Sequence, residues 1–176
     1  MKKALKITGK ILLGILITLV AAIVIMLIGN SINGRAPDGG INETMYADIN
    51  GTKQWINIYG QDKDNPVLLY LHGGPGSSTS HIDYAFTRKW SDVYTVFKWD
   101  QRNCGKSYGT SKTEAITADI MMQDGEETTE YLLNYMDKEK ITLLGHSWGS
   151  LYGANLALKY PEYYESFIGT GQFIDL

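Results

Sequence analysis

The sequence predicts a protein of the α/β class, in which helices cover a mostly parallel sheet, preceded by a long apolar helix at the N-terminus. Two observations predict the sheet: apolar runs of strand length recur along the chain, and segments with helical spacing separate them. A third observation is a glycine-serine-glycine turn between one of these runs and a helical segment. Such a turn places a candidate nucleophile at the end of a strand.

The first element is an apolar segment over residues 11–28, which contains no charged residue. A helix of this length spans about 27 Å, close to the thickness of the hydrocarbon core of a bilayer. Four lysines precede the segment, and no acidic residue occurs before Asp38. The positive-inside rule therefore predicts a basic cytoplasmic N-terminus over residues 1–10, a transmembrane signal-anchor over 11–28, and an extracytoplasmic remainder.

Two alternatives to a retained anchor follow from the same segment. Gly29 and Ser31 form a small-x-small pattern, so cleavage near Ser31 would give a secreted protein. A buried core helix fits poorly, because the segment is apolar on all its faces. The apolar run is longer than the core of a usual signal peptide, which favours a single-pass protein of the cell membrane. Residues 29–42 are expected to form a linker to a globular domain over 43–176.

The remaining elements follow from apolar spacing and turn signals. In chain order they are a hairpin of strands 44–49 and 53–59, a parallel strand at 67–71, a helix over 81–90, a strand at 94–99, a helix over 115–136, a strand at 141–144, a helix over 150–158 and a sixth strand at 166–171. Asn50-Gly51 predicts the hairpin, because this dipeptide favours a tight two-residue turn. Gly125 weakens the case for one continuous helix over 115–136. The core contacts expected from that helix are Ile116, Ile120, Tyr131, Leu132 and Tyr135.

The glycine-serine-glycine turn reads Gly145-His146-Ser147-Trp148-Gly149, a G-x-S-x-G pattern. A strand, a sharp turn and a helix together form a nucleophile elbow. A side chain at Gly145 or Gly149 is expected to collide with the neighbouring strand or helix. The elbow places the Ser147 hydroxyl at the start of a helix, where backbone N–H groups stabilise a developing negative charge. Ser147 is therefore the candidate nucleophile; a chance glycine-serine turn is the alternative.

A second motif, His72-Gly73-Gly74-Pro75-Gly76, directly follows the apolar run at 67–71. A run of glycine and proline cannot continue the strand, and it exposes backbone N–H groups with no side chain in the way. An oxyanion hole needs two such donors aimed at the carbonyl oxygen. We predict that the two donors are the backbone N–H groups of Gly74 and Trp148. Taken alone, the same residues would predict only a turn.

These two motifs, with Trp99-Asp100-Gln101-Arg102-Asn103-Cys104-Gly105-Lys106-Ser107 between them, resemble the α/β-hydrolase fold. Within that fold they most resemble the proline iminopeptidase-like group of serine peptidases. The resemblance covers about 43–176 and implies a sheet that stops after about its sixth strand. It also implies acyl transfer through Ser147, from peptides with an N-terminal proline or from small amides or esters. Asn103 stands where the family usually has glycine; because Asn tolerates the left-handed backbone, the loop is still expected to form.

A serine nucleophile needs a base, normally a histidine, and an orienting carboxylate. The chain has three histidines, His72, His81 and His146, and all precede Ser147. The order in this fold is serine, acid, histidine, so none of the three is expected to be the base. The resemblance implies that the acid and the base follow later strands, with a cap domain between them.

We therefore expect a fragment, or the N-terminal portion of a longer enzyme, that is inactive by itself. The alternative is a non-catalytic remnant or a binding module. The coding sequence downstream of Leu176 would distinguish the two, because only the first requires an in-frame acid and a late histidine.

Composition limits the partners. The formal net charge is −3, and beyond residue 28 the 12 basic against 19 acidic residues give −7, so no nucleic-acid partner is expected. Cys104 is the only cysteine, which excludes an internal disulfide and suggests a small buried thiol. No metal or cofactor is expected, because the histidines and the cysteine lack metal-site spacing. The expected partners are a small peptide, amide or ester substrate and, through residues 11–28, a lipid bilayer; the sequence does not define an oligomeric state.

Overall fold

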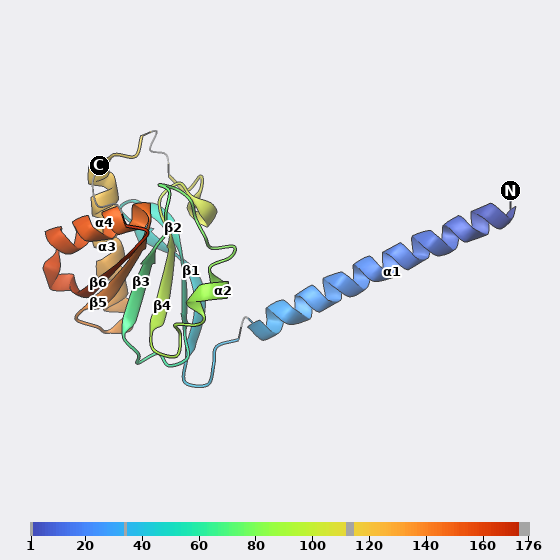
Figure 1. Ribbon diagram of the computed structural model, residues 1–176, viewed down its shortest axis with the longest axis horizontal. Coiled ribbons are helices and arrows are strands. Elements are labelled where there is room, and N and C mark those ends of the chain that lie inside the picture. The colour runs from blue at the N-terminus through green and yellow to red at the C-terminus, as the bar shows by residue number, and fades with distance from the viewer. Residues whose placement is uncertain (1, 34, 112–114, 173–176) are drawn as a thin grey trace. The chain divides into compact units, whose positions relative to one another are not determined.

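The structure is a computed structural model that describes residues 2–33, 35–111 and 115–172, with side chains over 7–29, 35–111 and 115–172 (Figure 1). The chain divides into two compact units, Met1–Arg35 and Ala36–Leu176. The first unit is the apolar helix, and the second contains the sheet and every candidate site residue.

The first unit consists of helix α1 (Lys2–Asn33), which is 32 residues long. Its stretch Ile7–Gly29 is 23 residues long, is apolar enough to cross a membrane and buries none of its surface against protein. The expected apolar N-terminal helix is therefore confirmed. Its length and composition fit a membrane span, and they also fit a signal sequence.

The second unit is built on a six-stranded sheet with the order β1-β2-β4-β3-β5-β6. The strands are β1 (Ile41–Ile49), β2 (Thr52–Gly60), β3 (Val67–Leu71), β4 (Thr95–Asp100), β5 (Ile141–His146) and β6 (Tyr164–Thr170). Strand β2 pairs antiparallel with β1 and β4, whereas the β4-β3, β3-β5 and β5-β6 pairs are parallel. The predicted hairpin turn is confirmed, with left-handed φ values of 44° at Asn50 and 72° at Gly51.

Three helices and two short 3-10 turns complete the unit. They are α2 (Tyr84–Thr87), η1 (Gly105–Ser107), α3 (Ala118–Met136), α4 (Trp148–Lys159) and η2 (Pro161–Tyr163). The helix expected over 81–90 is a single turn, because most backbone hydrogen bonds of that segment span three residues rather than four. The later helices begin at Ala118 and Trp148, close to the predicted residues.

Helix α3 runs without a break through Gly125. A Cβ atom added at Gly125 would lie 2.6 Å from both Leu156 Cδ2 and Tyr152 Oη of α4. The glycine thus permits the two helices to approach closely, at the small intrinsic cost that glycine has within a helix. The helix begins with Thr117, whose side chain accepts a hydrogen bond from the Ile120 N–H.

The core contacts predicted for α3 are only partly right. Leu132 is fully buried and Tyr131 packs against the core, but Ile116 and Tyr135 are 40% and 41% exposed. Ile116 precedes the helix, and Tyr135 stacks on Tyr131 at the surface while its hydroxyl donates to Glu43. The face of α3 that is buried consists largely of small and polar residues: Asp124, Gly125, Thr128, Thr129 and Leu132.

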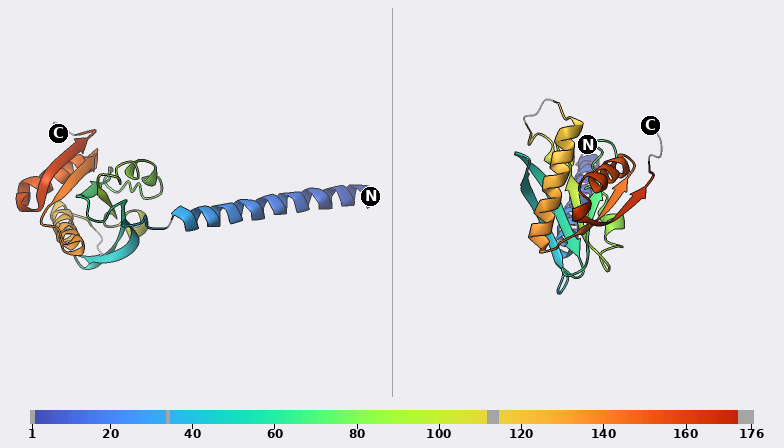
Figure 2. Two further views of the ribbon diagram at one scale, coloured as in Figure 1. Left: turned by 90° about the horizontal axis from the view of Figure 1, so that it is seen from below. Right: turned by 90° about the vertical axis from the view of Figure 1, so that its left-hand side faces the viewer.

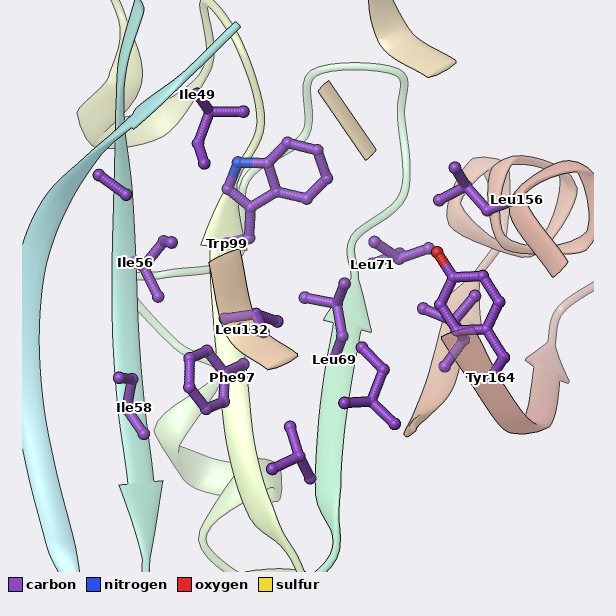
Figure 3. Close-up of a cluster of buried hydrophobic side chains, with 14 of the residues drawn as sticks. Ile49, Ile56, Ile58, Leu69, Leu71, Phe97, Trp99, Leu132, Leu156 and Tyr164 are labelled. Carbon is purple, nitrogen blue, oxygen red and sulfur yellow. The ribbon is translucent and has the colours of Figure 1, made fainter. Parts of the chain in front are cut away.

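Alternating residues of the central strands point to opposite faces of the sheet and form two clusters. On one face the sheet packs against α3 and α4, as Figure 3 shows with Phe97, Leu132 and Leu156. On the other face, Leu68 and Tyr70 pack against Phe86 and Trp90, beside α2. Figure 2 shows α3 and α4 side by side over the sheet. Both faces of the central strands are covered, as a parallel sheet requires.

Candidate active site

Ser147 occupies the turn between β5 and α4, with a φ of 52° and a ψ of −121°. A serine rarely adopts this backbone, so the surrounding structure must hold it there. A Cβ atom added at Gly145 would overlap the backbone of Gly149. A Cβ atom added at Gly149 would overlap the Leu71 carbonyl oxygen and lie 2.8 Å from that of His72. The expected collisions at both glycines are confirmed.

Hydrogen bonds on both sides hold the backbone of Ser147. Its N–H donates to the Thr170 carbonyl of β6 over 2.9 Å. Its own carbonyl accepts from the Ser150 N–H at 2.8 Å and from the Ser150 hydroxyl at 2.6 Å. The elbow is thus fastened to the neighbouring strand and to the first turn of α4, while the Ser147 side chain is half-buried.

The glycine loop after β3 lies directly beside this elbow. A Cβ atom added at Gly73 would be 3.3 Å from the Cβ of Ser147. Gly74 and Gly76 have φ values of 126° and 80°, which favour glycine. Within the described loops, the Gly74 N–H donates no backbone hydrogen bond. Trp148 is the first residue of α4, where an N–H group has no acceptor within the helix.

Asp100, at the end of β4, connects the loop that follows it to the segment after the glycine loop. Its carboxylate accepts from the Ser78 hydroxyl at 2.5 Å and from the Lys106 N–H at 2.8 Å. Gly105 has a φ of 49°, and a Cβ atom there would overlap the same carboxylate. Asp100 is 2% exposed, so it acts as a buried tie between the two loops. Because Ser78 lies 22 residues before Asp100, no local pattern in the sequence predicted this role.

The loop after β4 is also fastened to α3 by a buried ion pair. Arg102 Nε and Nη2 donate to the two Asp124 carboxylate oxygens over 2.7 and 2.6 Å. Arg102 Nη2 also donates to the Asn50 carbonyl, and Gln54 Nε2 donates to Asp124. The hydrogen bonds that Arg102 donates to Asp124 raise the pKa of Arg102 above its usual value. Asn103 next to the pair has a left-handed φ of 56°, as expected.

His72 and Cys104 form a buried contact behind these loops. His72 Nε2 lies 3.2 Å from Cys104 Sγ, and His72 Nδ1 lies 2.9 Å from the Gly73 carbonyl oxygen. Burial lowers the pKa of His72, so the ring is neutral at pH 7 and Nδ1 donates to Gly73. Burial also raises the pKa of Cys104 to about 12, which keeps it a thiol. The small buried thiol expected at Cys104 is therefore confirmed.

The other two histidines are exposed. His146 is the last residue of β5, directly before Ser147, and its Nδ1 lies 3.1 Å from Thr170 Oγ1. His81 lies in the turns before α2. All three histidines belong to the described part of the chain, and no hydrogen bond joins any of them to the Ser147 side chain. Among the described residues, no group of three or more His, Cys, Asp or Glu side chains could hold a metal ion.

Two adjoining cavities lie beside the loops. The first, of about 250 Å³, is lined by Gln101 and Arg102. The second, of about 390 Å³, is lined by Trp148. The two cavities share four lining residues, which are Pro75, Ile116, Met121 and Tyr152. They therefore extend from the glycine loop across the N-terminal parts of α3 and α4.

This sequence can be compared with known proteins. Residues 66–175 match the family described as alpha/beta hydrolase fold. The chain is 35% identical over 130 residues to a probable aminopeptidase, YbaC, from Bacillus subtilis, covering 72% of this chain and 40% of the relative. It is 30% identical over 126 residues to a proline iminopeptidase from Saccharolobus solfataricus, covering 72% and 39%. The chain thus spans about 40% of the length of these relatives.

Solved structures share the fold. A proline iminopeptidase-related protein from Thermus thermophilus superposes with a TM-score of 0.60 at 22% identity, covering 73% of this chain and 44% of that one. Epoxide hydrolase A from Mycobacterium thermoresistibile superposes with a TM-score of 0.59 at 27% identity, covering 73% and 39%. The elbow, the strand order and the family match agree, and the chain belongs to the α/β-hydrolase fold family, in which it is similar to proline iminopeptidases.

Proposed function

We propose that the protein to which this chain belongs is a serine hydrolase that transfers an acyl group from its substrate to Ser147 and then to water. The observation that supports this most is the approach of the glycine loop to the elbow, where Gly73 lies against Ser147. The proposed oxyanion donors are the N–H of Gly74, in this loop, and the N–H of Trp148, the residue after Ser147; neither N–H has an acceptor within its own loop or helix.

In the proposed reaction, Ser147 Oγ attacks the substrate carbonyl carbon and passes its proton to a general base. The resulting oxyanion accepts hydrogen bonds from the Gly74 and Trp148 N–H groups. Collapse of this intermediate expels the amine or alcohol and leaves an ester on Ser147, which water then hydrolyses. The base and its carboxylate would lie outside residues 1–176, because no hydrogen bond joins any of the three histidines to the Ser147 side chain.

The proposed substrates are peptides with an N-terminal proline, or small amides or esters. The relatives named aminopeptidase and proline iminopeptidase support the first class. We further propose that α1 anchors the protein in the cell membrane with the hydrolase domain outside the cytoplasm. The apolar stretch Ile7–Gly29 and the lysines before it support that topology.

The test uses the full chain in detergent micelles and supplies the base from solution. The chain is incubated with p-nitrophenyl acetate and imidazole, and the acetylated residue is identified by mass spectrometry. We expect Ser147 to be acetylated, and we expect the extent of acetylation to increase with the imidazole concentration. Acetylation should persist in the control variant S166A, which removes an exposed serine of β6. Acetylation that is spread evenly over several serines, or that spares Ser147, would instead support a non-catalytic module.

A further inference from the structure

The two cavities beside the elbow form one groove, which we call the Gln101 groove and define by Pro75, Gln101, Met121, Trp148 and Tyr152. Gln101 lines one half and Trp148 the other, while Pro75, Met121 and Tyr152 line both. Most of the other lining is apolar. Apolar walls with a few placed polar groups are typical of sites that bind small ligands.

Each half of the groove is lined by one residue whose side-chain nitrogen has no hydrogen-bond partner among the described residues. Gln101 Nε2 and Trp148 Nε1 are both buried, and neither has a hydrogen-bond partner in the described part of the chain. Gln101 as a whole is only 4% exposed. Buried polar groups in folded proteins are nearly always hydrogen-bonded, so an unpaired donor in a cavity wall indicates a site for an acceptor.

Contacts to both of its backbone groups hold Gln101 in place. The Gln101 N–H lies 3.4 Å from His72 Nε2. Its carbonyl accepts from the Cys104 N–H at 3.1 Å and from Cys104 Sγ at 2.9 Å. Both backbone groups of Gln101 are therefore held, and Gln101, His72 and Cys104 are all buried.

The charge of the groove selects a neutral partner. Arg102 and Asp124 both line the Gln101 half, but they neutralise one another in a bidentate ion pair. No other charged side chain lines either half. The groove therefore offers N–H donors and apolar walls, without a free charge for a carboxylate or an ammonium group.

We propose that the Gln101 groove binds the leaving portion of a peptide substrate, with a neutral carbonyl oxygen accepting from Gln101 Nε2. A second carbonyl would face Trp148 Nε1, since a peptide presents carbonyl groups separated by apolar side chains. Simple esters and alkylamides lack the additional carbonyl. This proposal depends on the proposed function for the identity of the ligand as substrate.

The test is equilibrium binding to the full chain in lipid nanodiscs, in an S147A background in which no acyl-enzyme can form. The first probe is prolyl-leucinamide, and the second is prolyl-isopentylamide, which lacks the terminal carboxamide. Fluorescence of Trp99 and Trp148 in the groove reports binding. Q101M removes the amide with little change in size, and Q61M is the matched control at an exposed glutamine.

We expect Q101M to weaken prolyl-leucinamide about tenfold and to leave prolyl-isopentylamide unchanged, as the loss of one good hydrogen bond predicts. Q61M should bind both probes as the parent does. The same test can be made without Q101M in the chain that keeps Gln101: binding of prolyl-leucinamide should shift the NMR signals of the Gln101 side-chain amide. This measurement does not depend on the folding of Q101M. The proposal is overturned if no probe binds saturably, or if Q101M affects both probes equally.

The two proposals fail separately. If Ser147 is not acetylated, the proposed function is contradicted, but the binding result in the S147A background still stands. Acetylation of Ser147 together with an equal effect of Q101M on the binding of both probes would support the nucleophile and exclude this use of the groove.

Discussion

Gly149 packs so closely on the carbonyl group of Leu71 that a Cβ atom at residue 149 would overlap that oxygen. The contact joins the first turn of α4 to the end of β3, and therefore joins the elbow to the glycine loop. Since both partners are backbone, the clash cannot be relieved by a change of rotamer.

We therefore expect G149A to destabilise the domain by at least about 2 kcal/mol, as overpacking of a filled core does. That loss corresponds to a fall in Tm of about 6 °C or more. The measurement is thermal unfolding of the full chain followed by near-ultraviolet circular dichroism. G14A is the control, because an added Cβ at Gly14 of α1 meets no atom within 4 Å. Equal melting of G149A and G14A would contradict the structure.

The ion pair between Arg102 and Asp124 is expected to respond strongly to the loss of one partner. D124A would leave the buried Arg102 guanidinium uncompensated, at a cost of about 3–5 kcal/mol. D48A removes an exposed partner of Lys53 and should cost less than about 1 kcal/mol. Urea unfolding of both variants checks this prediction. A similar loss in both would show that burial of the first pair does not determine its contribution.

His72 predicts a pH dependence of stability. Burial lowers the pKa of His72 below its usual 6.5, so the unfolded chain binds the proton more tightly than the folded chain. The stabilisation from a neutral His72 is fully present above about pH 6.5 and is lost as the pH falls toward the lowered folded-state pKa. H72N should flatten this part of the curve, and H81N, at an exposed histidine, should not. Unfolding midpoints between pH 5 and 8 provide the measurement; identical slopes in the two variants would refute the assignment.

We expect the 176-residue chain, expressed by itself, to be essentially inactive as a hydrolase. No hydrogen bond joins a histidine of the chain to the Ser147 side chain, and loss of the base costs on the order of a millionfold in turnover. The measurement is the rate of labelling of Ser147 by a fluorophosphonate, with S147A as the blank. A rate typical of serine hydrolases would mean that some group within the chain already acts as the base.

The proposed topology places everything beyond Arg35 outside the cytoplasm. Three lysines precede the apolar stretch Ile7–Gly29 and a fourth, Lys10, lies near its start, whereas only one basic residue lies between that stretch and Asp38. A protease added to intact cells should digest an epitope inserted in the hairpin turn at Asn50-Gly51 and spare one at the N-terminus. Protection of the hairpin epitope together with loss of the N-terminal one would reverse the orientation.

The local sequence determined those parts of the fold that depend on the backbone alone. The apolar run 67–71 is strand β3, Asn50-Gly51 forms the hairpin turn, and Gly145 and Gly149 flank an elbow that only glycine permits. A strand, a tight turn and a close backbone crossing each tolerate only certain side chains. A few adjacent residues are therefore enough to predict each of these features.

Tertiary structure alone decided which polar groups are paired. Arg102 donates to Asp124, which lies 22 residues later in the sequence, and Asn50 donates to the same carboxylate from 74 residues before it. The segment 81–90 forms only one turn of helix, and Ile116 is exposed although its spacing predicted burial. Gln101, which lines a cavity, keeps a buried and unpaired amide nitrogen for the same reason. Hydrogen bonds and burial between distant segments depend on how the sheet brings those segments together, and no local pattern of residues encodes that arrangement.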